Sequence, residues 1–169
     1  MGLKTEPMNP RFDKPPQEVI AQFKQLRKAM IDASSIIYAR KAGFIKILQS
    51  TLELMTIPEV MAEAGGDEGG IETIHCRSSF TTVDEKLVHC ALQNNLPVIS
   101  EDKKILSKLK QTHLPYFNAL MMLNFLCSVK AIDRDQYSHY HTKLQKIAWY
   151  SPKIWCYGDL MRSAIEKSS

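Results

Sequence analysis

The sequence predicts an α/β fold built around a parallel sheet. Short apolar runs alternate along the chain with longer stretches whose apolar residues recur at helical spacing. Strands that alternate with helices pair in parallel, because each helix returns the chain to the starting edge of the sheet. The chain has 169 residues, which is enough for one domain with a buried core.

The N-terminal region is expected to be an arm followed by one helix. Residues 1–14 are polar and contain two prolines, which is typical of a loose or extended segment. Pro16 suits the first position of a helix. We therefore divide the chain into a flexible arm over residues 1–14 and one domain over residues 15–169. One helical face follows Pro16 and consists of Val19, Ile20, Phe23 and Leu26.

Apolar runs mark the expected strands. The first run ends at Asp32, and a later run over residues 71–76 alternates apolar and polar side chains. The other runs are short and mainly apolar, which is typical of strands. The predicted strands cover residues 29–31, 54–57, 71–76, 96–99 and 114–117.

Start signals place helices between and after these strands. Thr82 and Glu85 have the spacing of a capping box, in which a hydroxyl and a carboxylate satisfy the first backbone N–H groups of a helix. The C-terminal region, beyond the last strand, is predicted to be helical. Other helix starts are predicted at Pro58, Asn118, Asp133 and Ser151.

Composition limits the class of protein. The formal net charge of +4 is compatible with a polyanionic partner but does not require one. No apolar run is long enough to span a bilayer, and the N-terminus lacks the apolar centre of a signal peptide. None of the four cysteines lies in a C-x-x-C motif, so we expect free thiols, most of them in the core. The expected location is the cytoplasm, with no membrane partner.

Four acidic residues at the edges of predicted elements are candidate metal ligands: Asp32, Glu63, Asp84 and Asp102. Asp32 and Asp102 each follow a strand, and sites on open α/β sheets form outside the carboxyl ends of the strands. Carboxylates that converge there repel one another and need a cation. Oxygen ligands of this kind suit Mg²⁺ or Mn²⁺.

Each of these residues also has a purely structural interpretation. Asp84 could complement a helix dipole, Asp102 could cap a helix, and Glu63 could be an exposed helix acid. Asp32 is the hardest to explain in this way, because it follows a buried strand and an unpaired buried carboxylate is costly.

Taken in order, these segments resemble the motifs of PIN-domain nucleases. MIDASSIIY resembles the first motif, and IPEVMAEA the second, which favours Glu63 over Glu59. TTVDEKLVHCALQNNLPVISED resembles the third and fourth. The match runs from about residue 30 to residue 102, and the C-terminal half agrees in pattern only. The chain departs from the smallest members in its N-terminal segment, in Glu85 after Asp84, and in the extra acids Asp67 and Glu68.

The resemblance implies a three-layer α/β/α fold with a compact, mainly parallel sheet. It implies that Asp32, Glu63, Asp84 and Asp102 hold Mg²⁺ or Mn²⁺ and act in catalysis. It also implies that Ser34 and Ser100 hydrogen-bond the carboxylates and so orient them.

The function implied is metal-dependent hydrolysis of RNA, endonucleolytic in type. Toxin–antitoxin PIN ribonucleases supply one context, with a protein antitoxin as partner and a homodimer as the assembly. The rival hypothesis is a catalytically inactive PIN-like module that binds RNA or protein. A phosphatase with an aspartate nucleophile is disfavoured, because Ser34 stands where it would need a second aspartate.

Two further groups of residues leave alternatives open. Arg40, Lys41, Lys103 and Lys104 are candidate RNA contacts, although a solvated helix face explains the lysines equally well. The aromatic residues near the C-terminus are expected to pack in the core or in a dimer rather than stack on bases. They are Trp149, Tyr150, Trp155 and Tyr157.

Overall fold

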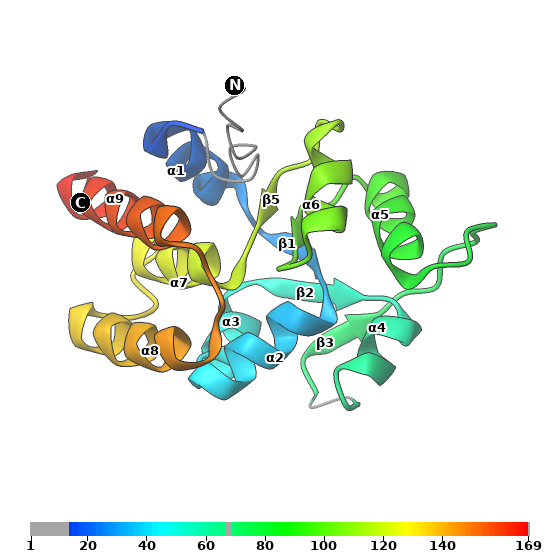
Figure 1. The fold of residues 1–169 in the computed structure, drawn as a ribbon, viewed down its shortest axis with the longest axis horizontal. Coiled ribbons are helices and arrows are strands. Elements are labelled where there is room, and N and C mark those ends of the chain that lie inside the picture. The colour runs from blue at the N-terminus through cyan, green and yellow to red at the C-terminus, as the bar shows by residue number, and fades with distance from the viewer. Residues whose placement is uncertain (1–13, 67–68, 169) are drawn as a thin grey trace, which may run out of the picture.

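The sheet is parallel throughout, as predicted. A computed structural model describes residues 14–66 and 69–168, so most of the expected arm and the acids Asp67 and Glu68 lie outside the described residues. Within the described residues, five strands form one sheet in the order β3-β2-β1-β4-β5 (Figure 1). The strands are β1 Lys28–Ile31, β2 Glu53–Thr56, β3 Ile71–Thr73, β4 Val98–Ile99 and β5 Tyr116–Phe117.

The predicted strands are all present, and three of them are shorter than expected. β3 was predicted to reach residue 76 but ends at Thr73. Its partner β2 ends at Thr56, whose carbonyl accepts the last hydrogen bond, from Ile74 N, at 2.8 Å. β4 and β5 keep only the residues that pair with a neighbouring strand.

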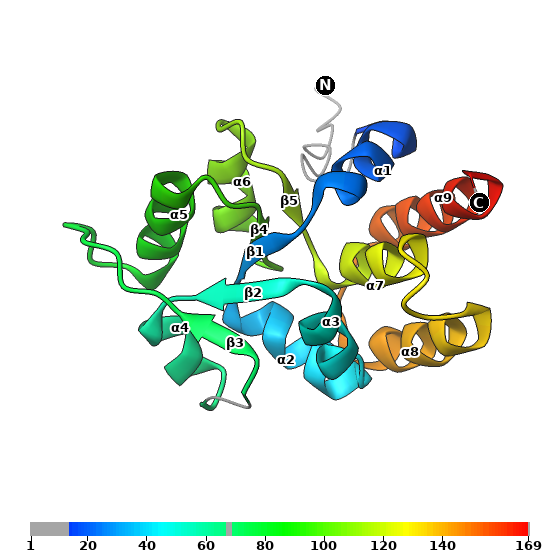
Figure 2. The same ribbon diagram turned by 180° about the vertical axis from the view of Figure 1, so that it is seen from behind.

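Helices cover the sheet and give the three-layer α/β/α architecture that was predicted. α5 and α6 pack against each other, and the C-terminal helices α7, α8 and α9 form a second group with α1 (Figures 1 and 2). α2 packs against α8 of this second group. The helices are α1 Pro16–Gln25, α2 Ala33–Ala42, α3 Ile45–Thr51, α4 Pro58–Glu63, α5 Val83–Asn94, α6 Lys103–Lys110, α7 Ala119–Ser128, α8 Arg134–Ile147 and α9 Pro152–Ser168.

The core joins the sheet to α7. The β1 residues Ala29, Met30 and Ile31 are fully buried, as expected for the central strand of a sheet covered on both faces. Every residue of α7 from Ala119 to Leu126 is buried, and all but Asn124 are apolar, so this helix belongs to the interior. Within the described residues, no helix is both long and apolar enough to cross a membrane.

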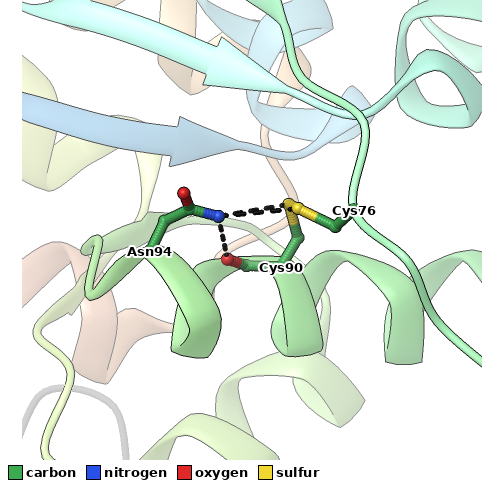
Figure 3. The surroundings of a disulfide bond; sticks show 3 residues. All are labelled: Cys76, Cys90 and Asn94. Atoms are coloured by element: carbon green, nitrogen blue, oxygen red, sulfur yellow. Dashed lines mark hydrogen bonds between the residues drawn. A yellow bond between two sulfur atoms is a disulfide. The ribbon is translucent and has the colours of Figure 1, made fainter.

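Two of the cysteines depart from the expectation of free thiols. Cys76, in the segment after β3, forms a disulfide with Cys90 of α5 (Figure 3). Asn94, one turn further along α5, donates a hydrogen bond to the Cys90 carbonyl at 2.8 Å. The disulfide fixes the segment after β3 to the helix that carries Asp84. Disulfides are rare in reducing compartments, so the cysteines do not support the expected cytoplasmic location.

Candidate active site

The predicted aspartates lie at the switch point of the sheet. From β1, the next strands β2 and β3 are added on one side of the sheet, and β4 and β5 are added on the other side. The order therefore reverses between β1 and β4, and open α/β sheets bind ligands at such a point. Asp32 follows β1, and residues 100–102 follow the neighbouring β4. The Asp32 backbone N–H donates to Ile99 O at 2.8 Å, which brings these two strand ends together.

Asp32 is a buried carboxylate held at both oxygens. It is the N-cap of α2, and its Oδ1 accepts a hydrogen bond from Ala33 N at 2.8 Å. Its Oδ2 accepts one from Ser100 Oγ at 3.0 Å. Only 7% of the residue is exposed, and burial raises its pKa. The negative charges of Asp84 and Asp102 raise that pKa further.

Ser100 links Asp32 to Asp102. The fully buried Ser100 hydroxyl donates to Asp32 and accepts a hydrogen bond from the Asp102 backbone N–H at 3.0 Å. The prediction that Ser100 supports a site carboxylate is therefore confirmed as a contact. Asp102 also caps α6, since its Oδ1 accepts from Lys104 N at 2.7 Å. The cap interpretation of Asp102 is therefore confirmed. Its second carboxylate oxygen takes no part in that hydrogen bond, so a role of Asp102 as a ligand stays a prediction.

Asp84 reaches the same region from a third element. It lies in the first turn of α5, after the predicted cap Thr82, whose hydroxyl accepts from Glu85 N at 3.2 Å. Burial raises the pKa of Asp84, and the charge of Asp102 raises it further. Lys108 and Lys104 oppose this rise. Three aspartates from separate elements thus lie within electrostatic reach of one another.

Glu63 is less closely tied to this group. It is the exposed last residue of α4, and its charge is not among the main causes that raise the pKa of Asp32 or Asp84. The competing residue Glu59 forms an ion pair with Lys86 of α5 at 3.5 Å. A role for Glu63 as a ligand therefore stays a prediction.

The serine expected beside Ser100 is the wrong one. The Ser34 hydroxyl is buried and makes no hydrogen bond, so the prediction that it orients a carboxylate is wrong. Its neighbour Ser35 is fully buried and donates instead to the carboxylate of Glu101. On a helix, the side chains of adjacent residues point about 100° apart, so only one of the two neighbouring serines can face the sheet edge.

Glu101 was not predicted to take part in the site. Its carboxylate accepts hydrogen bonds from Ser35 Oγ, from Tyr150 Oη and from Ala119 N at 3.1 Å, the first residue of α7. Burial raises its pKa to about 6, and the charge of Asp32 adds to this. The sequence signal was present but weak, because Glu101 fills the variable position between Ser100 and Asp102.

The predicted basic residues divide into two sets. Lys103 and Lys104 are exposed in the first turn of α6, beside Asp102. Arg40 instead donates from Nη1 to Ala64 O at 2.7 Å and so fixes the end of α4. Lys41 is exposed in the last turn of α2, which begins at Asp32, so about 14 Å of helix separates the two residues.

The site residues fit a hard divalent cation only as a sparse set of ligands. Among the described residues, no group of three or more His, Cys, Asp or Glu side chains could hold a metal ion. Mg²⁺, however, is usually bound by one or two carboxylates, with water and substrate phosphates completing its shell. Asp32 and Asp102, joined through Ser100, offer such a pair. Asn118, which follows β5, has a buried amide N–H₂ without a hydrogen-bond partner at the same edge. As a donor, this group is not a ligand for the cation.

No family model, curated protein or solved structure gives a significant match to this chain. The structure by itself defines the class of this protein: an α/β/α protein with a carboxylate cluster at the switch point of its parallel sheet.

Replacing Ser100 by alanine is expected to loosen this cluster without unfolding the protein. The substitution removes one hydrogen bond to Asp32 and one from Asp102 N. Loss of a contact that orients a metal ligand typically lowers metal affinity by about 10- to 100-fold. Titration of Mn²⁺ into wild type and Ser100→Ala should show this loss, whereas Ser107→Ala on the exposed face of α6 should not. Equal affinities would contradict the assigned role.

Proposed function

We propose that this protein is a PIN-type ribonuclease that hydrolyses phosphodiester bonds of RNA with Mg²⁺ or Mn²⁺, as an endonuclease. One observation supports this most strongly. Asp32, Asp84 and Asp102 come from three elements at the switch point of the sheet. The charges of Asp84 and Asp102 raise the pKa of Asp32, and the charge of Asp102 raises the pKa of Asp84. Such mutual repulsion is unfavourable in a purely structural cluster and is relieved when a cation binds.

The residues of this chain have distinct parts in the proposed reaction. A bound divalent cation would supply an activated water and neutralise charge on the phosphate oxygens. Asp32 and Asp102 would hold it, with Ser100 fixing both, and Asp84 would complete the negative site. Glu63 remains a candidate for orienting water. Lys103 and Lys104 would contact the phosphates of the bound strand.

The test is a cleavage assay with purified protein and a labelled single-stranded RNA. We expect cleavage with Mn²⁺ or Mg²⁺ and none with EDTA. Internal cut sites on a circular RNA substrate would establish endonucleolytic cleavage. Absence of cleavage, together with no divalent cation bound in a calorimetric titration, would contradict the proposal.

A second candidate function is a catalytically inactive PIN-like module that binds RNA or a protein. One observation favours it: among the described residues, no three His, Cys, Asp or Glu side chains are grouped closely enough to hold a metal ion. In that case Mn²⁺ would not change the melting temperature of the protein.

The cellular context belongs to the same proposal. A toxin–antitoxin role would require a protein antitoxin that covers the site, and co-purification of such a partner from the native source would test it. A homodimer and a cytoplasmic location are proposed with it, although the Cys76–Cys90 disulfide argues against a reducing compartment. Light scattering of the purified protein tests the first of these.

A further inference from the structure

Trp149 differs from the aromatic residues around it. In the linker between α8 and α9, Tyr150 is partly buried and stacks edge-on against Trp155, with ring centroids 5.1 Å apart. Tyr157 is also anchored, since its hydroxyl donates to Lys14 O at 2.6 Å. Trp149, by contrast, is 95% exposed. Core packing therefore accounts for the other three aromatic residues but not for Trp149.

The linker lies beside the carboxylate site. The Tyr150 hydroxyl donates to Glu101, which sits between Ser100 and Asp102. The ring of Tyr150 also meets Tyr38 of α2, at 6.2 Å between centroids. In Figure 1 the linker between α8 and α9 passes the start of α7, where β5 ends. Because consecutive Cα atoms are about 3.8 Å apart, the backbone of Trp149 lies directly beside that of Tyr150, whose side chain reaches Glu101.

The surroundings of Trp149 are basic. Between Asp135 and Asp159 the sequence has no acidic residue. Lys146, in the last turn of α8, and Lys153, in the first turn of α9, are both exposed and flank the linker. Exposed aromatic rings interleaved with lysines are the usual means of binding single-stranded nucleic acid, in which the ring stacks on a base and the lysines contact phosphates.

A protein interface fits this position less well. Stable protein partners cover contiguous apolar patches, not single side chains. The residues next to Trp149 in the linker are the half-buried Ala148 and Tyr150 and the exposed Ser151. The other exposed large hydrophobic residues of the described chain lie on other elements: Phe80, Leu92, Val129 and Leu160.

We infer that Trp149 is a base-stacking residue that holds an unpaired nucleobase beside the carboxylate site. The inference rests on the proposed ribonuclease function and deepens it, because it assigns a residue of this chain that would bind a base of the RNA. A duplex keeps its bases stacked within the helix and would not present one to this ring.

The test uses the fluorescence of the full chain in EDTA, so that binding is separated from cleavage. The chain has two tryptophans, and Trp155→Phe leaves Trp149 as the sole reporter. The probes are a single-stranded RNA of about ten nucleotides, the same backbone with abasic positions, and a duplex of equal length. We expect strong quenching by the first probe only. Trp149→Ala should weaken binding of that probe by about 5- to 150-fold.

Two control variants sharpen the result. Trp149→Phe keeps a stacking ring and should retain most of the affinity. Leu160→Ala removes another exposed apolar side chain, from α9, and should bind like wild type. Equal quenching by the abasic probe, unchanged affinity in Trp149→Ala, or no binding of any probe would overturn the inference. So would a change of oligomeric state in Trp149→Ala with unchanged RNA affinity, which would make this residue a protein contact.

The cleavage assay keeps this inference distinct from the proposed function. Base-dependent quenching at Trp149 without metal-dependent cleavage would refute the nuclease and leave the stacking residue standing. Cleavage by wild type with unaltered RNA affinity in Trp149→Ala would refute only the inference.

Discussion

Asp32→Asn is expected to abolish metal-dependent cleavage while leaving the metal-free protein at least as stable as wild type. The loss of activity should be on the order of 100- to 1,000-fold, the scale seen when one group that stabilises charge in the reaction is removed. Folding should survive, because asparagine caps helices as well as aspartate does and its Oδ1 can still accept from Ala33 N.

The direction of the stability change follows from the pKa of Asp32. Burial raises this pKa above its unfolded value, so the folded state prefers the protonated acid. Stability from this preference is complete below the unfolded pKa and is lost as the pH rises through the folded pKa. At neutral pH the ionised Asp32 therefore destabilises the metal-free protein, and asparagine relieves this.

Thermal melting with and without Mn²⁺ checks the prediction. At 100 times its dissociation constant, Mn²⁺ should stabilise wild type by about 2.7 kcal/mol and raise the melting temperature by roughly 5–10 °C. Asp32→Asn should lose most of this rise. Asp135→Asn, an exposed acid in the first turn of α8, is the matched control and should behave like wild type. Cleavage at the wild-type rate by Asp32→Asn would refute its role as a ligand.

Glu101→Ala is expected to destabilise the fold and to reduce activity together. The carboxylate is the common acceptor of Ser35, Tyr150 and the first N–H of α7. Alanine leaves these donors unsatisfied, and each buried unsatisfied donor costs about 1–3 kcal/mol. We expect a loss of roughly 3–5 kcal/mol in the free energy of unfolding near pH 5, measured by urea denaturation in EDTA.

This destabilisation should depend on pH. The folded pKa of Glu101 is about 6, against 4.5 for the free side chain, so wild type loses about 2 kcal/mol as the pH rises through that window. Glu101→Ala lacks this titration. Because pH 5 already lies above the unfolded value of 4.5, part of that loss has occurred there, and the difference between the two proteins in the free energy of unfolding should narrow by about 1 kcal/mol between pH 5 and pH 8. Glu72→Ala, an exposed acid on β3, should change stability by less than about 0.5 kcal/mol at either pH. If the difference in the free energy of unfolding between wild type and Glu101→Ala grew as the pH rose, the buried environment assigned to Glu101 would be contradicted.

The sequence predicted well where the strands that carry the site end. Asp32 and Ser100 each follow a buried apolar run, and the change from such a run to a helix start marks the end of a strand. The parallel sheet then brings the two residues together, since β1 and β4 are neighbours. What the pattern did not contain was the strand order, which decides that these two ends meet.

The remaining parts of the site depend on contacts far apart in the chain. Ser35 and Glu101 are 66 residues apart, and Tyr150 and Glu101 are 49 apart, so no local pattern joins them. The choice of Ser35 over Ser34 depends on the helix rotation. The pairing of Cys76 with Cys90 depends on the path of a loop without regular structure. The exposure of Trp149 depends on how the linker crosses the sheet edge.

The most direct test of the metal site is anomalous diffraction from crystals of the protein grown with Mn²⁺. We predict a manganese peak at the switch point, with carboxylate oxygens of Asp32 and Asp102 about 2.0–2.2 Å from the ion. Manganese bound elsewhere, or no peak at this edge of the sheet at saturating Mn²⁺, would contradict the proposal that this is a metal-dependent nuclease site.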